Sequence, residues 1–178
     1  MKKFRVKDWV LMGLSLAMMI VVGKILYTIS LSLPIPSSRV LMTAPAFAFI
    51  YTATILKTRK IGTVSLISLC YAIYMLRFSA FGALAGLSSG VLSDILTLIV
   101  FKNYNKDRNI YYSVPTKSAF GVWTSFFIVK MFVPNSRFVQ AGIIPTLIVT
   151  VIIYLIGYLA SRYTLQVFSK RIVRAWRI

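Results

Sequence analysis

The sequence predicts an all-α integral membrane protein with six transmembrane helices, both termini on the cytoplasmic side, and a basic amphipathic helix at its C-terminus. The 178 residues are 58% hydrophobic, and only 13% are charged, whereas soluble domains carry about a quarter charged residues. The mean hydropathy is +0.81. The apolar residues fall into six runs near the roughly 20 residues that span a bilayer. Most of the 21 Lys and Arg residues lie in the two terminal segments and in alternate connections between these runs.

Polar or proline-containing turns separate the six runs. Pro34 and Pro36 interrupt any helix across the first turn, and the segment 102–109 is polar and typical of a loop. We expect a single domain over 1–178, with helices at about 9–33, 40–56, 61–76, 81–101, 110–133 and 138–160 and an amphipathic tail at 163–178.

The tail differs from the apolar runs. Leu165, Phe168, Ile172 and Trp176 recur at helical spacing, with basic residues between them. This pattern is typical of a helix that lies at the headgroup boundary of a membrane. The alternative is a cytoplasmic extension of the sixth helix.

The fourth run, 81–101, changes character along its length. Its first half is almost all Gly, Ala and Ser, and its second half is aliphatic around a single carboxylate, Asp94. Small residues let another backbone, or a ligand, approach closely. We therefore expect this helix to be the central one of the bundle.

The distribution of basic residues predicts the orientation. If both termini are cytoplasmic, fifteen Lys and Arg residues flank the helices inside, and only Arg39, Arg77 and Arg137 flank them outside. Such a bias follows the positive-inside rule. The net charge of +18 is then explained by anchoring and by contact with anionic membrane lipids. We expect a multi-pass protein of the plasma membrane and no nucleic-acid partner.

The composition argues against several kinds of chemistry. The chain has no His, no Glu and one Cys, Cys70, so we expect no metal site and no cofactor. Asp8, Asp94 and Asp107 are the only acidic side chains, which gives poor support to paired acid–base catalysis. We expect no enzyme activity. No P-loop motif is present, so uphill transport would need partner subunits or an ion gradient.

Asp94 and Lys117 are the ionisable residues expected near the cytoplasmic half of the bundle. Each lies seven residues from the cytoplasmic end of its predicted helix, so the two should lie at similar depth. An ion pair between them would offset two costly charges. The functional alternative is that Asp94 carries a proton or binds a cationic ligand.

The outer half carries positive charge and aromatic residues. Lys24 is too deep to reach the surface easily on a lipid-facing side, so it could meet an anionic or polar ligand. Lys130 could instead extend its side chain to the membrane surface. The aromatic residues could serve only helix packing. The candidate ligand-binding residues are Lys24, Tyr27, Arg39, Trp123, Phe127 and Lys130. Gly13 and Ala17 form a small-residue face suited to contact with another helix.

Three segments carry a resemblance to a known family: 43–48 (TAPAFA), 57–60 (KTRK) and 86–94 (GLSSGVLSD). With the six-helix pattern, the chain resembles the substrate-binding S components of energy-coupling factor (ECF) vitamin transporters, in particular the MptD or Trep-Strep subgroup.

This resemblance implies an outward-facing cavity for a vitamin-like solute, capped by the loop 34–39. It also implies an EcfT-like transmembrane subunit, which Gly13 and Ala17 would contact, and two ATPase subunits that drive the loaded protein to topple in the bacterial plasma membrane. The alternative function is a proton-coupled transporter of small solutes that uses Asp94.

Overall fold

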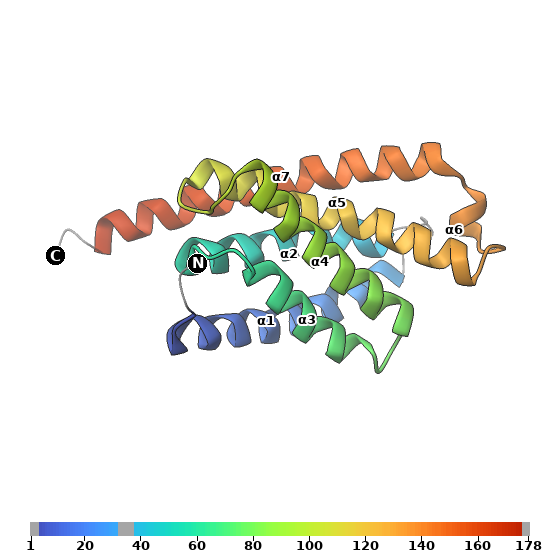
Figure 1. Ribbon diagram of the computed structural model, residues 1–178, viewed down its shortest axis with the longest axis horizontal. Coiled ribbons are helices and arrows are strands. Elements are labelled where there is room, and N and C mark those ends of the chain that lie inside the picture. Colours follow the sequence, from blue (N-terminus) through green and yellow to red (C-terminus); the bar gives the residue numbers. More distant parts are fainter. Residues whose placement is uncertain (1–3, 32–37, 176–178) are drawn as a thin grey trace.

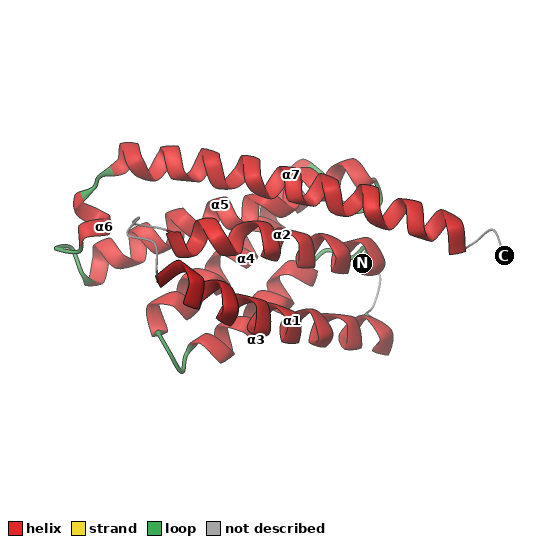
Figure 2. Ribbon diagram, turned by 180° about the vertical axis from the view of Figure 1, so that it is seen from behind, coloured by secondary structure: helices red, strands yellow, loops and turns green. Residues whose placement is uncertain are grey.

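The structure is a computed structural model that describes residues 4–31 and 38–175. Every regular element in these residues is a helix (Figure 1; Figure 2). The helices are α1 (Val6–Leu31), α2 (Ser38–Thr58), α3 (Thr63–Met75), α4 (Ala80–Val100), α5 (Asp107–Phe132), α6 (Arg137–Gln140) and α7 (Ile143–Ala175). The predicted all-helical class is confirmed for the described part of the chain.

In the described part of the chain, four helices are long and apolar enough to cross a membrane. The spanning segments of α1, α2, α4 and α7 are Val6–Ser30, Val40–Thr58, Ala80–Val100 and Ile143–Phe168. By contrast, α3 has 13 residues, or about 20 Å of helix, against a hydrocarbon core of roughly 30 Å. The 26 residues of α5 are long enough, but they include Lys117 and Lys130. Four predicted spans are thus supported by length and composition, and the six-span topology stays a prediction.

The last span and the tail form one helix. A turn at Gly142, whose φ is +89°, separates the short α6 from α7, which then continues without a break to Ala175. The prediction of a separate amphipathic helix from residue 163 is wrong, and the alternative of an extended last helix is confirmed. The reason is packing: Ser161 accepts a hydrogen bond from Thr52 of α2 at 3.0 Å, and Thr164 is fully buried. Residues 176–178 of the predicted tail lie outside the described residues.

The central helix is α2. It contacts α1, α3, α5 and α7, whereas α4 packs mainly against α3 and α5 (Figure 1). The expectation that the fourth helix is central is therefore wrong. Much of α4 is open on its outer side, where Ile95, Leu98 and Ile99 are exposed.

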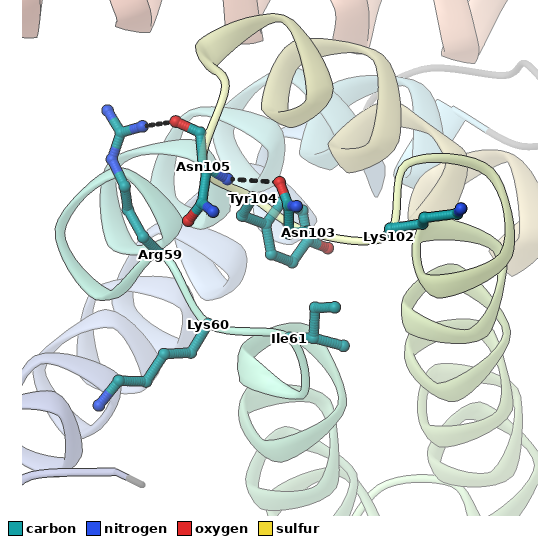
Figure 3. Close-up of a pocket in the computed structure, with 7 residues that line it drawn as sticks. All are labelled: Arg59, Lys60, Ile61, Lys102, Asn103, Tyr104 and Asn105. Atoms are coloured by element: carbon teal, nitrogen blue, oxygen red, sulfur yellow. Dashed lines mark hydrogen bonds between the residues drawn. The ribbon is translucent and has the colours of Figure 1, made fainter. Parts of the chain in front are cut away.

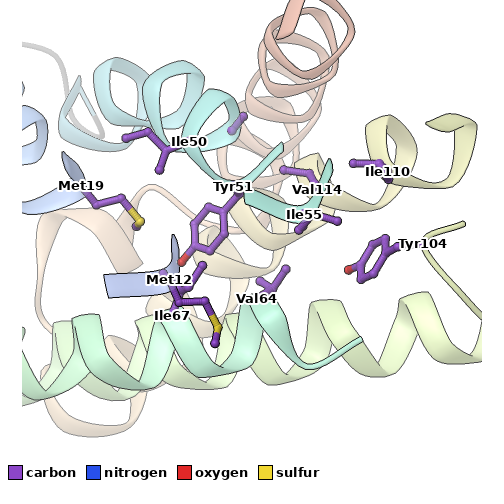
Figure 4. Packing of buried hydrophobic residues seen from close by; sticks show 11 residues of the cluster. Met12, Met19, Ile50, Tyr51, Ile55, Val64, Ile67, Tyr104, Ile110 and Val114 are labelled. Atoms are coloured by element: carbon purple, nitrogen blue, oxygen red, sulfur yellow. The ribbon is translucent and has the colours of Figure 1, made fainter. Parts of the chain in front are cut away.

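The main core surrounds Tyr51 of α2 (Figure 4). It joins α1, α2, α3, α5 and the connection before α5, through the buried side chains of Met12, Met19, Ile50, Tyr51, Ile55, Val64, Ile67, Tyr104, Ile110 and Val114. Hydroxyl pairs also link the helices, including Ser15 with Thr54 at 2.5 Å and Tyr51 with Ser68 at 3.0 Å. Such interhelical hydrogen bonds are common where helices pack within a membrane.

The small residues of α4 allow close helix packing. A Cβ atom added at Gly90 would lie under 3.0 Å from the side chain of Ser68 on α3. On the other side of α4, Thr124 of α5 donates a hydrogen bond to the carbonyl of Ala85 at 3.1 Å. The small residues of α4 could admit either a neighbouring backbone or a ligand. These contacts support the first reason, the close approach of neighbouring helices.

The start of α1, the end of α7 and the connections α2–α3 and α4–α5 lie at one end of the bundle (Figure 1). Two ion pairs tie this end together. Lys60 contacts Asp8 at 2.5 Å, and Arg59 contacts Asp107 at 2.6 Å. These elements hold most of the basic residues that we predict to be cytoplasmic.

Candidate functional site

The carboxylate of Asp94 is held at the N-terminus of α3. It accepts hydrogen bonds from the backbone amide of Ser65 at 2.7 Å and from the Ser65 hydroxyl at 2.6 Å. The first amides of a helix have no partner within the helix and favour negative charge. Asp94, which is 6% exposed, therefore acts as a cap for α3 supplied by α4.

Tyr104 completes this buried polar cluster. Its hydroxyl donates to Asp94 at 3.2 Å and lies 3.3 Å from the Thr97 hydroxyl. Burial and the neighbouring carboxylate raise the pKa of Tyr104, so the phenol keeps the proton that it donates. The cluster anchors the α4–α5 connection to the start of α3.

The predicted ion pair between Asp94 and Lys117 is wrong, although the two residues do lie at similar depth. Ser93 and Thr116, their chain neighbours, face each other at 3.2 Å between their hydroxyl oxygens. One residue further along a helix turns the side chain by about 100°. Asp94 thus faces α3, and Lys117 faces α2.

Lys117 lies against two aromatic rings of α2. Its Nζ is 4.8 Å from the centroid of Tyr51 and 5.7 Å from that of Phe47. Such cation–π contacts contribute about 2 kcal/mol when they are desolvated. Taking an ammonium out of water costs several kcal/mol. The two rings therefore offset only part of the cost of this charge.

No carboxylate pairs with Lys117 among the described residues. The chain has three acidic side chains in total, and all three are described. Each has other partners: Asp8 binds Lys60, Asp107 binds Arg59, and Asp94 binds Ser65 and Tyr104. Lys117 is a cation without a counterion from an acidic side chain of its own chain.

The candidate binding residues that the sequence assigns to the outer half are not brought together into one group. Lys24 and Tyr27 are exposed on α1, which packs against α2 and α3, whereas α5 packs against α2, α4 and α7. Trp123 and Phe127 of α5 do lie together, with ring centroids 5.9 Å apart.

The other two candidates in this group give no support to a shared pocket either. Lys130 is exposed near the end of α5, as the snorkelling alternative expects. The side chain of Arg39 lies outside the described residues, and so does most of the predicted capping loop, 32–37.

Gly13 and Ala17 are both exposed on α1. A Cβ atom added at Gly13 would meet no atom within 4 Å. Large apolar side chains flank these positions, among them Leu14 and Met18, which are 59% and 46% exposed. The small-residue face predicted for contact with another helix is thus free of other helices of this chain.

A cavity between the α2–α3 and α4–α5 connections was not anticipated from the sequence (Figure 3). Its volume is about 310 Å³, and it is lined by Arg59, Lys60, Ile61, Lys102, Asn103, Tyr104 and Asn105. The Arg59 guanidinium donates to the carbonyl of Asn105 as well as to Asp107, so its charge is already used at the rim. No signal in the sequence pairs the α2–α3 and α4–α5 connections that form this cavity.

Within residues 4–31 and 38–175, no group of three or more Cys or Asp side chains is placed to hold a metal ion. Comparisons with protein-family models, with curated proteins and with solved structures give no match for the chain.

Proposed function

We propose that the chain is the membrane-embedded substrate-capture subunit of an ECF-type importer. In this proposal it binds a vitamin or related micronutrient in an outward-facing pocket of the bacterial plasma membrane. It then delivers the solute inward together with an EcfT-like transmembrane subunit and two ATPase subunits. The chain itself is not an enzyme.

The observation that carries the proposal is the open small-residue face of α1. The resemblance to S components requires Gly13 and Ala17 to meet the EcfT-like subunit, and both residues are exposed. In lipid, helices associate through close van der Waals packing at small residues rather than through the hydrophobic effect. A face of this kind, left open by the other helices of the chain, suits a partner helix.

The alternative, a proton-coupled transporter with Asp94 as the carrier, has less support. Three donor groups engage the Asp94 carboxylate, and the residue is 6% exposed. A carrier must exchange its proton with both sides of the membrane. The contacts of Asp94 instead favour a structural role.

Recovery of partner subunits tests the proposal. The tagged chain is extracted from the membranes of its own cells in a mild detergent, and the proteins that come with it are identified by mass spectrometry. We expect an EcfT-like protein and two ATPases. Ala17→Leu, which fills the small-residue face, should reduce their recovery, and Met18→Leu on the same helix serves as the control.

Two results would refute the proposal. One is the absence of these subunits from the wild-type preparation. The other is uptake of solute by vesicles that contain the purified chain alone and are driven by a pH gradient, which would favour the proton-coupled alternative.

A further inference from the structure

We propose that Lys117 binds the negative charge of the transported solute, and that this solute is a small organic anion. This inference rests on the proposed function and assigns the ligand class of its binding site. It also requires the outward-facing pocket to reach down to Lys117, which lies ten residues from the predicted cytoplasmic end of α5. In this view the counterion missing from the chain is supplied by the ligand, which lies beside the rings of Phe47 and Tyr51.

The depth of Lys117 is the first argument. It lies ten residues after Asp107 and fifteen before Phe132, the two ends of α5. These separations correspond to about 15 and 22 Å of helix, beyond the reach of a lysine side chain. Lys117 therefore cannot bring its charge to either end of the helix. If α5 crosses the membrane, as the six-helix topology predicts, an ionisable residue at this depth marks a functional site by default.

The second argument is that Lys117 Nζ has no hydrogen-bond acceptor among the described residues, and the same is true of the hydroxyl of Tyr71 on α3. Both groups border Phe47: the ring of Tyr71 meets that of Phe47 edge-on, with centroids 5.6 Å apart, and Lys117 Nζ lies 5.7 Å from the Phe47 centroid. An ammonium and a phenol that flank one aromatic ring are suited to an anion that carries an apolar part.

The third argument is that neighbouring side chains do not completely cover either group. In the described residues, every side-chain nitrogen or oxygen that is fully buried has a hydrogen-bond partner. Lys117 Nζ and the Tyr71 hydroxyl have none, so each retains accessible surface. All six residues from 116 to 121 of α5 likewise keep intermediate accessibility. These donors are therefore not completely covered by neighbouring side chains, and we place the solute against the surface that they retain.

Binding of a matched pair of small probes tests the inference. The full chain, purified in mild detergent, is titrated with benzoate and with benzamide, which share a ring and differ in charge, and binding is followed by calorimetry. We expect benzoate to bind at least tenfold more tightly than benzamide, because charge-assisted hydrogen bonds contribute more than neutral ones.

Variants assign the effect to the proposed residues. Lys117→Met should weaken benzoate binding roughly tenfold or more, and Lys117→Arg should retain most of it because the charge remains. Tyr71→Phe should cause a smaller loss. Lys106→Met, which removes an exposed lysine directly before the same helix, should bind benzoate as the wild type does. The thermal stability of each variant without probe shows that it is folded.

Three results would overturn the inference: equal affinity for benzoate and benzamide, unchanged benzoate affinity in Lys117→Met, or binding of inorganic phosphate without any binding of benzoate. The experiment uses the chain alone. Its failure therefore leaves the recovery of partner subunits unaffected, while loss of that recovery with intact benzoate binding would refute the proposed function only.

Discussion

The contact between α3 and α4 gives the sharpest test of the packing. In Gly90→Ala the new Cβ atom would lie under 3.0 Å from the Cβ and Oγ atoms of Ser68 and 3.5 Å from the carbonyl oxygen of Val64. Ser68 is 1% exposed, and its hydroxyl pairs with that of Tyr51 at 3.0 Å. Ser68 therefore has little room to move, and moving it would break a buried hydrogen bond.

The expected cost follows from three contributions. Overpacking a well-packed site costs about 1–3 kcal/mol, and a broken buried hydrogen bond adds about 1 kcal/mol or more. Replacing Gly by Ala within a helix stabilises the folded state by about 1 kcal/mol through its higher helix propensity. The net loss is about 2 kcal/mol, which corresponds to a decrease in Tm of roughly 4–8 °C for a chain of this length.

Thermal unfolding in a single detergent checks this value. Gly86→Ala is the matched control, because it lies one turn earlier in α4 and its added Cβ would meet no atom within 4 Å. We expect this variant to be as stable as the wild type or more stable by up to about 1 kcal/mol. Adding Ser68→Gly to Gly90→Ala should recover part of the loss. Equal Tm values for the two alanine variants would refute the described packing of α3 on α4.

Three further predictions concern the charged groups. Asp94→Asn should lower the stability by about 1–3 kcal/mol, because the amide is a weaker acceptor for the Ser65 donors; a restored Tm on adding Lys117→Met would instead indicate an ion pair between the two residues. Lys117→Met alone, measured without ligand, should leave the Tm unchanged or raise it, because it removes a charge without a counterion; a large decrease would contradict the lack of a partner. Asp107→Ala should lower the free energy of unfolding by less than about 1 kcal/mol, because the side chains of Asp107 and Arg59 are 53% and 39% exposed. The loss should be smaller still at high salt, which screens exposed charges. A larger loss in denaturation curves would contradict the description of this ion pair as a surface pair.

The sequence predicted where the helices lie along the chain more reliably than it predicted which helices contact one another. Length and hydropathy identify the apolar runs, and α1, α2 and α4 follow the predicted boundaries to within a few residues. The end of the last helix was missed because the basic amphipathic pattern of the tail was interpreted as a separate helix, although residues 160–163 contain neither Gly nor Pro. Its continuation depends on the contact of Ser161 with Thr52, and residues 109 positions apart in sequence give no local signal.

In the candidate site, the sequence likewise predicted the position of each residue along its helix but not the neighbouring helix that its side chain faces. Helical rise placed Asp94 and Lys117 at one level, as the Ser93–Thr116 contact shows. The side to which each residue turns depends on the rotation of each helix about its own axis, and this rotation is set by packing. A signal for the true partner of Asp94 did exist, because Ser65 follows the Gly62 turn at the start of a helix, where unpaired amides attract a carboxylate.

The most direct test of substrate capture is to identify the small molecules that the chain retains. The wild-type chain is purified alone in a mild detergent, denatured, and the released molecules are analysed by mass spectrometry against a Lys117→Met preparation. We expect one small organic acid in near-stoichiometric amount from the wild type and a strongly reduced amount from the variant. Release of only lipid and detergent from both preparations would contradict capture of a small organic anion by this chain.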